Sequence, residues 1–216
     1  MTILLTAFEP FGGEKINPAL EAVHLVSGQI AGAQIIKLTV PTVFGRAADV
    51  VTEAIGSLRP QAVVCIGQAG GRTAITVERV AINIEDASIP DNVGVTPVDR
   101  PVIPGAPAAY FSTLPIKDMV KAIRDVGLPA SVSNTAGTFV CNHLMFGVLH
   151  LIKNEFPGTL GGFIHVPYLT EQAAQKAEPA FGMALKDITR GLEASLDAVA
   201  EALQQRSAEV KEIFLK

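Results

Sequence analysis

Residues 44–67 read FGRAADVVTEAIGSLRPQAVVCIG and combine two hydrophobic patterns. In residues 44–58 the apolar side chains recur at helical spacing, whereas residues 62–67 form a short continuous apolar run. Such a run is typical of a strand that is covered on both faces. A helix that leads into a buried strand is the repeating unit of folds built around a parallel sheet. The segment therefore predicts an α/β fold.

The same alternation extends along the rest of the chain. Strands are predicted at residues 2–7, 34–40, 130–133 and 162–166, with a further extended stretch near residues 80–84. Helices are predicted over residues 115–126, over about 142–155, and along the apolar stripe from Leu185 to Leu203, after which a polar tail is expected to fray. A chain of 216 residues suits one α/β domain, so we expect a single domain over residues 1–216 with a largely parallel sheet.

The composition narrows the range of partners. Hydrophobic residues make up 49% of the chain and charged residues 18%, so much of the surface is expected to be buried. The formal net charge is -4 and no Lys and Arg cluster appears, which argues against nucleic acid. No apolar run approaches the ~18 residues of a membrane span, and the N-terminus has no signal-peptide pattern. We expect a cytoplasmic protein that binds neither nucleic acid nor a membrane.

Cys141 lies where residues 136–143, AGTFVCNH, lead into an amphipathic stretch, so it is predicted at a helix N-terminus. The unpaired N–H groups and the helix dipole favour a thiolate there and can line an oxyanion hole. The alternative is a small buried core residue, and position alone leaves both interpretations open. Cys65 lies in an apolar run and is interpreted as core. Both cysteines are expected to be free thiols.

A thiolate mechanism needs a proton carrier, and the chain has four histidines. His165 ends a short apolar strand, where the catalytic groups of open α/β sheets gather. His143 lies two residues from Cys141 and would point to another face of a helix. His24 and His150 lie in helical stretches and are interpreted as structural or exposed. The alternative for His165 is a structural histidine bonded to the backbone.

Glu78 is the candidate that would orient the imidazole, because it follows the strand at residues 62–67 and the glycine-rich residues 67–72. The alternative is a surface ion pair with Arg79, worth under about 1 kcal/mol. The glycines match neither the dinucleotide nor the P-loop pattern. No ligand cluster completes a metal site with the cysteines. We therefore expect no cofactor and no metal.

Residues 85–109 interrupt the alternation with many prolines, too many for a helix or a central strand. They are predicted to form a long surface loop. Long loops in compact domains are commonly functional, so we expect this one to border the active site.

The stretches FEPFGG (residues 8–13) with Asn17-Pro18, GQAGGR (67–72) with ERVAIN (78–83), and GTFVCNH (137–143) with GGFIHVP (161–167) occur in this order. Together they resemble the pyroglutamyl peptidase type I family of cysteine peptidases, also called pyrrolidone-carboxylate peptidases. The resemblance implies an α/β/α sandwich with a mostly parallel mixed sheet, no cofactor or metal, and frequent homodimers or homotetramers.

The resemblance also implies an activity, which is hydrolysis of the bond after an N-terminal pyroglutamyl residue of a peptide. The family's triad falls on Cys141, His165 and Glu78, with Cys141 as the nucleophile. Two places depart from the family's pattern. Ser88 stands where many relatives have Arg, which puts a charge near the oxyanion or the loop in doubt. Residues 18–20 lack an aromatic side chain that relatives often carry.

Pyroglutamate has no free amine, so its recognition must use the lactam ring, with two apolar faces and one edge that carries an N–H donor and a C=O acceptor. Phe8, Phe11 and Phe139 are the candidate walls, and Asn17 and Gln68 are the candidates for the polar edge. The alternative is that these phenylalanines are core. Two other functions stay open, namely a cysteine amidase for another small amide and a binding protein that keeps the pocket without turnover.

Overall fold

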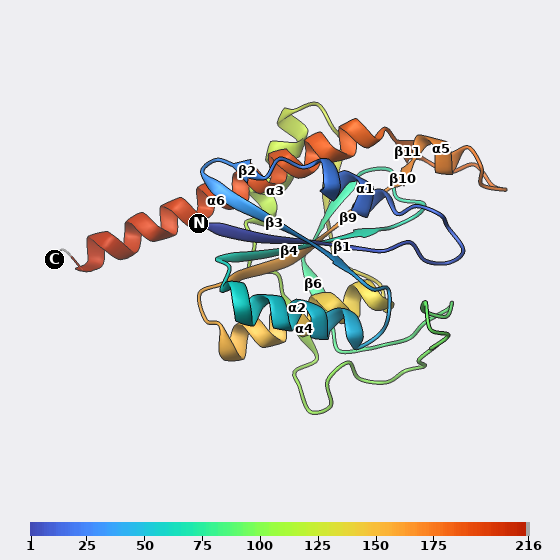
Figure 1. Cartoon of the computed structure of the whole chain (residues 1–216), viewed down its shortest axis with the longest axis horizontal. Helices are drawn as coiled ribbons and strands as arrows, with labels where there is room; N and C mark the ends of the chain where they lie inside the picture. The colour runs from blue at the N-terminus through green and yellow to red at the C-terminus, as the bar shows by residue number, and fades with distance from the viewer. Residues whose placement is uncertain (215–216) are drawn as a thin grey trace.

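The structure, a computed structural model, describes the backbone of residues 1–214 and the side chains of residues 1–209. A seven-stranded sheet lies at the centre, and helices cover both of its faces (Figure 1). The strands follow the order β2 (Gln29–Ile30), β3 (Ala33–Val40), β1 (Thr2–Phe8), β4 (Ala62–Gln68), β9 (Leu160–Val166), β5 (Ile75–Glu78) and β8 (Ala130–Ser133). The predicted α/β class is confirmed.

Side chains of the strands alternate between two hydrophobic clusters. In β1, Ile3, Leu5 and Ala7 join one cluster, and Leu4 and Phe8 join the other. Because strand side chains alternate between faces, such a sheet is stable only with a cover on each side. The first cover consists of α1 (Pro18–Leu25), α3 (Ile116–Asp125) and α6 (Leu185–Phe214), and the second of α2 (Arg46–Leu58) and α4 (Val140–Glu155). The layers form the α/β/α sandwich that the resemblance implied.

The order of the strands places a reversal of winding direction between β1 and β4, two central strands of the sheet. Strand β1 pairs in parallel with β3 and β4, and β4 pairs in parallel with β9. The chain leaves β1 through α1 on one face and reaches β4 through α2 on the other face. Open α/β sheets bind ligands beyond the carboxyl ends of strands at such a reversal. In this chain the reversal lies beyond Phe8 and Gln68.

The sheet is mixed because β5 runs antiparallel to β9 and parallel to β8, while β2 runs antiparallel to β3. Strand β5 was not predicted from the sequence. Residues 80–84 were predicted as one extended stretch, but only β6 (Val80–Ile82) forms there, and it pairs with β7 (Ala109–Phe111) outside the main sheet. The predicted loop therefore ends in a strand at Ala109.

The polar tail after Leu203 continues α6 to Phe214, so the prediction that it frays is wrong. Its residues include good helix formers such as Ala, Glu and Lys, which favour continuation of the helix. This part of α6 extends past the sheet (Figure 1), and residues 204–209 are exposed. Within residues 1–214, no helix is both long and apolar enough to cross a membrane.

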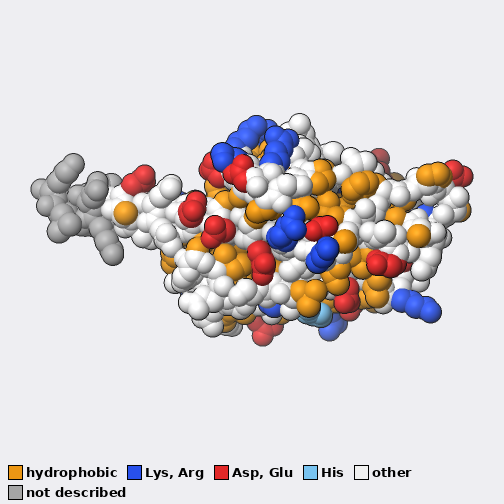
Figure 2. Space-filling model, turned by 90° about the horizontal axis from the view of Figure 1, so that it is seen from above, with side chains coloured by type: hydrophobic (Ala, Val, Ile, Leu, Met, Phe, Trp, Pro, Cys, Tyr) orange, Lys and Arg blue, Asp and Glu red, His pale blue; other side chains and the backbone are white. Residues whose placement is uncertain are grey.

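Short elements complete the fold: β10 (Tyr168–Leu169), α5 (Thr170–Ala173) and β11 (Gly182–Met183) follow β9 and lead into α6. On the face shown in Figure 2, acidic and basic side chains are interspersed among apolar ones. Lys and Arg side chains gather at the upper edge of this view, with acidic side chains directly beside them.

Candidate active site

Cys141 occupies the second position of α4, which confirms its predicted place at a helix start. The residue that precedes the helix is Phe139, and its side chain makes no capping hydrogen bond. The first N–H groups of a helix have no partner within the helix, and without a capping side chain they stay available to a ligand. The start of α4 therefore offers backbone donors beside the sulfur of Cys141.

Gly67 brings Cys141 and His165 to the same point of the sheet. It pairs directly with His165 in the ladder between β4 and β9. A Cβ atom on Gly67 would lie 3.0 Å from Cys141 Sγ and 2.8 Å from the ring of Phe163. Glycine in a strand commonly marks such a close approach. The sulfur thus lies over the strand position next to His165.

His165 and Glu78 form a buried pair. The Nδ1 atom of His165 lies 2.7 Å from Glu78 Oε1, and the two side chains are 4% and 0% exposed. The alternative of a surface ion pair between Glu78 and Arg79 is wrong, because Glu78 is buried in β5 and Arg79 Nε donates instead to Asn134 Oδ1 at 2.8 Å. The structure therefore brings Cys141, His165 and Glu78 together on the α4 face of the sheet.

Arg72 is a further member of this site that the sequence analysis did not single out. Its Nη1 atom donates to Glu78 Oε1 at 2.5 Å and also to the hydroxyl of Thr76. Its Nη2 atom donates to the carbonyl of Thr135 at 2.9 Å. The only sequence signal was its place at the end of the glycine-rich stretch after β4. Arg72 and the imidazole of His165 therefore share Oε1 of Glu78 as their acceptor.

The electrostatics of Cys141 differ from the sequence expectation. The protein packed around the sulfur raises the pKa of its thiol to about 12, and the negative charge of Glu78 acts in the same direction. The nearby charge of Arg72 and a backbone hydrogen bond lower that pKa but do not outweigh the first two effects. The predicted resting thiolate is therefore not favoured, because desolvation of the charged form exceeds the help from the helix start.

The pKa values of the other two groups favour a neutral imidazole beside a carboxylate. Burial lowers the pKa of His165 below its ordinary value of 6.5, an effect that Arg72 strengthens and Glu78 only partly offsets. Burial raises the pKa of Glu78, but its hydrogen bond with His165 and the charges of His165 and Arg72 bring it below the ordinary 4.5. At neutral pH the site holds a thiol, a neutral imidazole and a carboxylate.

Three aromatic rings border the start of α4. Phe139 is half-buried, and the centre of its ring lies 6.1 Å from that of Phe11 and 5.4 Å from that of Phe44. Phe44 was not predicted as a site residue, because it begins a helical pattern and shares no motif with the others. Phe8, in contrast, is 2% exposed and packs against Phe163, so the alternative of a core residue describes it better.

The two candidates for the polar edge lie on the face of the sheet that α1 covers. Asn17 caps α1: its Oδ1 accepts from the N–H of Ala19 at 3.0 Å, and its Nδ2 donates to the carbonyl of Glu9 at 3.3 Å. One hydrogen of Nδ2 remains for another acceptor. Gln68 follows Gly67 in β4, so its side chain points to the face of the sheet opposite to Cys141. Its buried Oε1 has no hydrogen-bond partner among residues 1–209.

The other histidines and Cys65 lie where the sequence suggested. His24 is exposed on α1, and His150 Nδ1 lies 2.9 Å from the hydroxyl of Tyr110. Cys65 is buried in β4, which confirms it as core, and both cysteines are free thiols.

The proline-rich loop contacts the segment that precedes Cys141. The N–H of Asp86 donates to the carbonyl of Thr138 at 3.0 Å, and the hydroxyl of Thr138 donates to the carbonyl of Asp86 at 2.6 Å. Thr138 is three residues before Cys141, so the loop borders the site as predicted. Ser88 follows two residues later and is exposed.

Comparison with known proteins gives one consistent family. The family model for pyroglutamyl peptidase matches residues 1–202. The pyrrolidone-carboxylate peptidases of Streptococcus suis (strain 05ZYH33) and Streptococcus pyogenes serotype M4 are 56% and 57% identical over 201 residues, which is 93% of this chain and 93% of each relative.

Solved structures agree with this result. Pyroglutamyl peptidase I from Bacillus amyloliquefaciens is 48% identical, with a TM-score of 0.89 over 92% of this chain and 94% of that chain. A mutant pyrrolidone carboxyl peptidase from Pyrococcus furiosus is 40% identical, with a TM-score of 0.90 over 94% of this chain and 100% of that chain. The chain therefore belongs to the pyroglutamyl peptidase family of cysteine-type hydrolases.

Proposed function

We propose that this chain removes an N-terminal pyroglutamyl residue from peptides through a thioester on Cys141, with His165 and Glu78 completing the triad. The observation that carries the proposal is the 2.7 Å contact between His165 Nδ1 and Glu78 Oε1 beside the sulfur of Cys141. His165 pairs with Gly67 in the ladder, and the sulfur lies over Gly67. A nucleophile, a base and a group that orients the base are the three parts that covalent acyl transfer requires.

The reaction begins from a neutral thiol. Glu78 accepts the Nδ1 hydrogen of His165, which leaves the lone pair on Nε2 free to take the proton of Cys141 as sulfur attacks the pyroglutamyl carbonyl. The proton then passes from Nε2 to the departing amine as the C–N bond breaks and the thioester remains. Water, deprotonated by the same Nε2, hydrolyses the thioester and restores the thiol.

The backbone amides at the start of α4 stabilise the negative charge that develops on the carbonyl oxygen. Because Phe139 provides no capping acceptor, these N–H groups need not be displaced from a side chain when the oxyanion forms. The buried carboxylate of Glu78 stabilises the imidazolium that His165 becomes during the reaction. Arg72 keeps that carboxylate ionised and in place.

The lactam ring is proposed to lie against the rings of Phe11, Phe44 and Phe139. The free Oε1 of Gln68 is the acceptor for the lactam N–H, and the remaining Nδ2 hydrogen of Asn17 is the donor for the lactam carbonyl. An N-terminal proline has a similar ring but carries a cationic amine. Burying that charge without a partner is costly, so prolyl substrates are rejected.

Hydrolysis of chromogenic amides by the purified protein tests this function. We expect rapid release from the pyroglutamyl amide and almost none from the prolyl and glutaminyl amides. Comparable kcat/KM values for the prolyl and pyroglutamyl compounds would refute the lactam pocket. Equal rates on unrelated small amides would favour a general amidase, and stoichiometric acylation of Cys141 without turnover would favour a binding protein.

The assembly state and the location in the cell stay predictions. A homodimer or homotetramer would bury exposed apolar side chains such as Phe111, which is 67% exposed on β7. Sedimentation analysis of the purified chain measures the assembly directly.

A further inference from the structure

A second histidine–carboxylate pair includes His143, two residues after Cys141 on α4, and takes no part in the chemistry above. His143 Nδ1 lies 2.5 Å from Glu85 Oε1, and Arg100 Nε donates to the other oxygen of Glu85 at 2.8 Å. The side chains of His143 and Glu85 are 9% and 6% exposed, whereas that of Arg100 is 54% exposed. The loop thus places the buried carboxylate of Glu85 against His143 in α4, and the more exposed Arg100 donates to the same carboxylate.

The partners of His143 define its protonation. The N–H of Gly45 donates to His143 Nε2 at 3.1 Å, so Nε2 carries a lone pair and Nδ1 carries the hydrogen that Glu85 accepts. The charged groups that face the ring are Glu85 and Arg100 from the loop and Asp49 from α2. Burial lowers the pKa of His143 below 6.5, and the attraction of Glu85 and Asp49 only partly offsets it. His143 is neutral at neutral pH.

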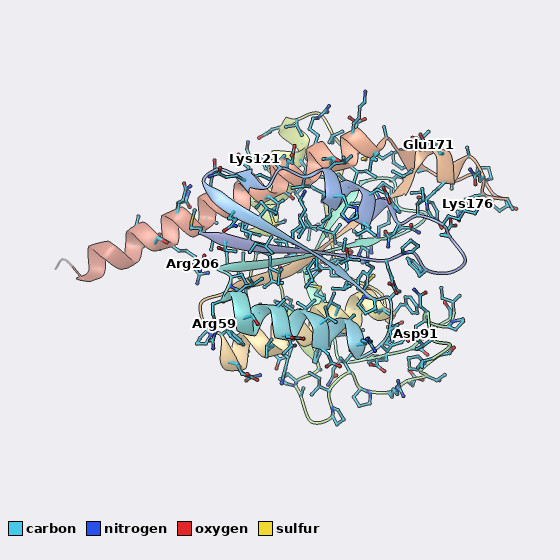
Figure 3. The ribbon with its side chains drawn as sticks, viewed as in Figure 1. Arg59, Asp91, Lys121, Glu171, Lys176 and Arg206 are labelled. Atoms are coloured by element: carbon cyan, nitrogen blue, oxygen red, sulfur yellow. The ribbon has the colours of Figure 1, made fainter. Side chains whose placement is uncertain are left out.

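The same histidine fixes Phe44. The ring of Phe44 meets His143 edge to face at 5.7 Å between ring centres, and it meets Phe139 in the same way at 5.4 Å. The backbone on each side of the Phe44 side chain is also held: the N–H of Phe44 donates to Asp91 Oδ2 at 3.0 Å, and the next N–H, that of Gly45, donates to His143. Figure 3 labels Asp91 beside the start of α2.

Asn142, the neighbour of His143, binds the backbone of the residues that lead to Glu85. Its Oδ1 accepts from the N–H of Ile82 at 2.9 Å, and its Nδ2 donates to the carbonyls of Ile82 and Ile84 at 2.8 and 3.0 Å. These bonds tie the strand that leads into the loop to α4. Since Glu85 follows directly, His143 meets a carboxylate whose backbone is already held.

We propose that His143 is a positioning residue of the pyroglutamyl pocket, which holds Phe44 against Phe139 and thereby sets the affinity for the substrate ring without touching the reacting atoms. This inference rests on the proposed function, because it assigns the rings of Phe44 and Phe139 to the lactam. Neutral His143 supplies both the acceptor for Gly45 and the ring surface for Phe44. Its loss would loosen the wall and leave the triad intact.

Three variants of the full chain test this role. His143→Asn removes the acceptor for Gly45 and the ring beneath Phe44, whereas His143→Gln extends an amide oxygen to the place of Nε2. His150→Asn is the matched control, because His150 lies on the same helix and bonds to Tyr110 instead. The readouts are kcat and KM for a pyroglutamyl amide, the rate at which iodoacetamide alkylates Cys141, and the protection that 2-pyrrolidone gives against it.

We expect His143→Asn to raise KM and the 2-pyrrolidone protection constant about tenfold, equivalent to ~1.4 kcal/mol of binding, with kcat and the unprotected alkylation rate within about twofold of the wild type. His143→Gln is expected to raise KM about threefold, and the control to leave it unchanged. If His143→Asn does not fold, His143→Gln carries the test alone. A folded variant with unchanged KM, or with its loss in kcat alone, overturns the inference.

Different results would contradict the proposed function and the role of His143. A wild-type protein that does not cleave the pyroglutamyl amide, and whose Cys141 is not protected by 2-pyrrolidone, contradicts the proposed function itself. An active wild type with an unaffected His143→Asn variant contradicts only the role of His143.

Discussion

Gly67 and Cys141 meet across the α4 face of the sheet, and the distance between them leaves no room for a side chain at residue 67. A Cβ atom there would approach the sulfur to 3.0 Å and the Phe163 ring to 2.8 Å. Because Gly67 also pairs with His165 in the ladder, Cys141 and His165 are aligned by one backbone position. The geometry of the site therefore depends on a residue that has no chemistry of its own.

Gly67→Ala is expected to reduce kcat/KM by more than tenfold and to destabilise the fold by ~1–3 kcal/mol, because the packed Phe163 ring or the thiol must move. The matched control is Gly56→Ala in α2, where an added Cβ meets nothing within 4 Å. It is expected to keep activity and add ~0.5–1 kcal/mol of stability. Kinetics and thermal unfolding measure both effects, and an active Gly67→Ala enzyme would contradict the alignment.

Cys141→Ala is expected to abolish turnover, whereas Cys65→Ala is expected to keep most of it and lose about 1 kcal/mol of stability. Both thiols have a pKa raised to about 12, but Cys65 is enclosed in β4 while Cys141 is partly exposed beside His165. Mass spectrometry after incubation with substrate locates the acyl group. Equal loss of activity in both folded variants would show that the nucleophile is wrongly assigned.

His165→Ala is expected to lower kcat by about 10³-fold or more, because no other group can carry the proton. Glu78→Gln is expected to retain more activity, since an amide oxygen still accepts the Nδ1 hydrogen although the charge is lost. Arg72→Met removes the guanidinium that bonds to Glu78, and a loss of kcat with unchanged KM is expected. Full activity in His165→Ala would exclude the proposed base.

The pH dependence follows from the neutral resting state. Catalysis needs unprotonated His165, so kcat/KM is constant above the pKa of His165 and falls as the pH falls through it. Since burial lowers that pKa, the acid limb of the profile is expected below pH 6.5. The thiolate absorbance of the wild type minus that of Cys141→Ala is expected to be absent at neutral pH, because the thiol pKa is about 12. A thiolate signal at pH 7 would contradict this charge state.

Sequence patterns predicted the parts of the site that depend on local structure. Cys141 precedes an amphipathic run and His165 ends a buried strand, and each pattern places its residue without knowledge of the rest of the fold. Phe8 and Phe11 show the limit of the same reasoning. They share one motif, yet Phe8 is the last residue of β1 and buried, while Phe11 lies in the loop beyond it.

Contacts between segments that are distant in the chain could not be predicted from local sequence patterns. Strand β5 has four residues, too few for a periodic pattern, so its antiparallel place beside β9 was not predicted. One alternative paired Glu78 with its neighbour Arg79. The side chain of Arg79 bonds to Asn134 instead, and Arg72 reaches the carboxylate of Glu78. The desolvation that raises the pKa of Cys141 likewise depends on how the whole site packs.

The raised pKa of Cys141 has a consequence for the lifetime of the enzyme in air. Peroxide attacks the thiolate, and oxidation to a sulfenic acid begins there. An active site that keeps its sulfur protonated until a substrate arrives is therefore a slow target for that damage. We expect hydrogen peroxide to inactivate the resting enzyme more slowly at pH 7 than at pH 10, and equal rates of inactivation at the two pH values would contradict the raised pKa of the thiol.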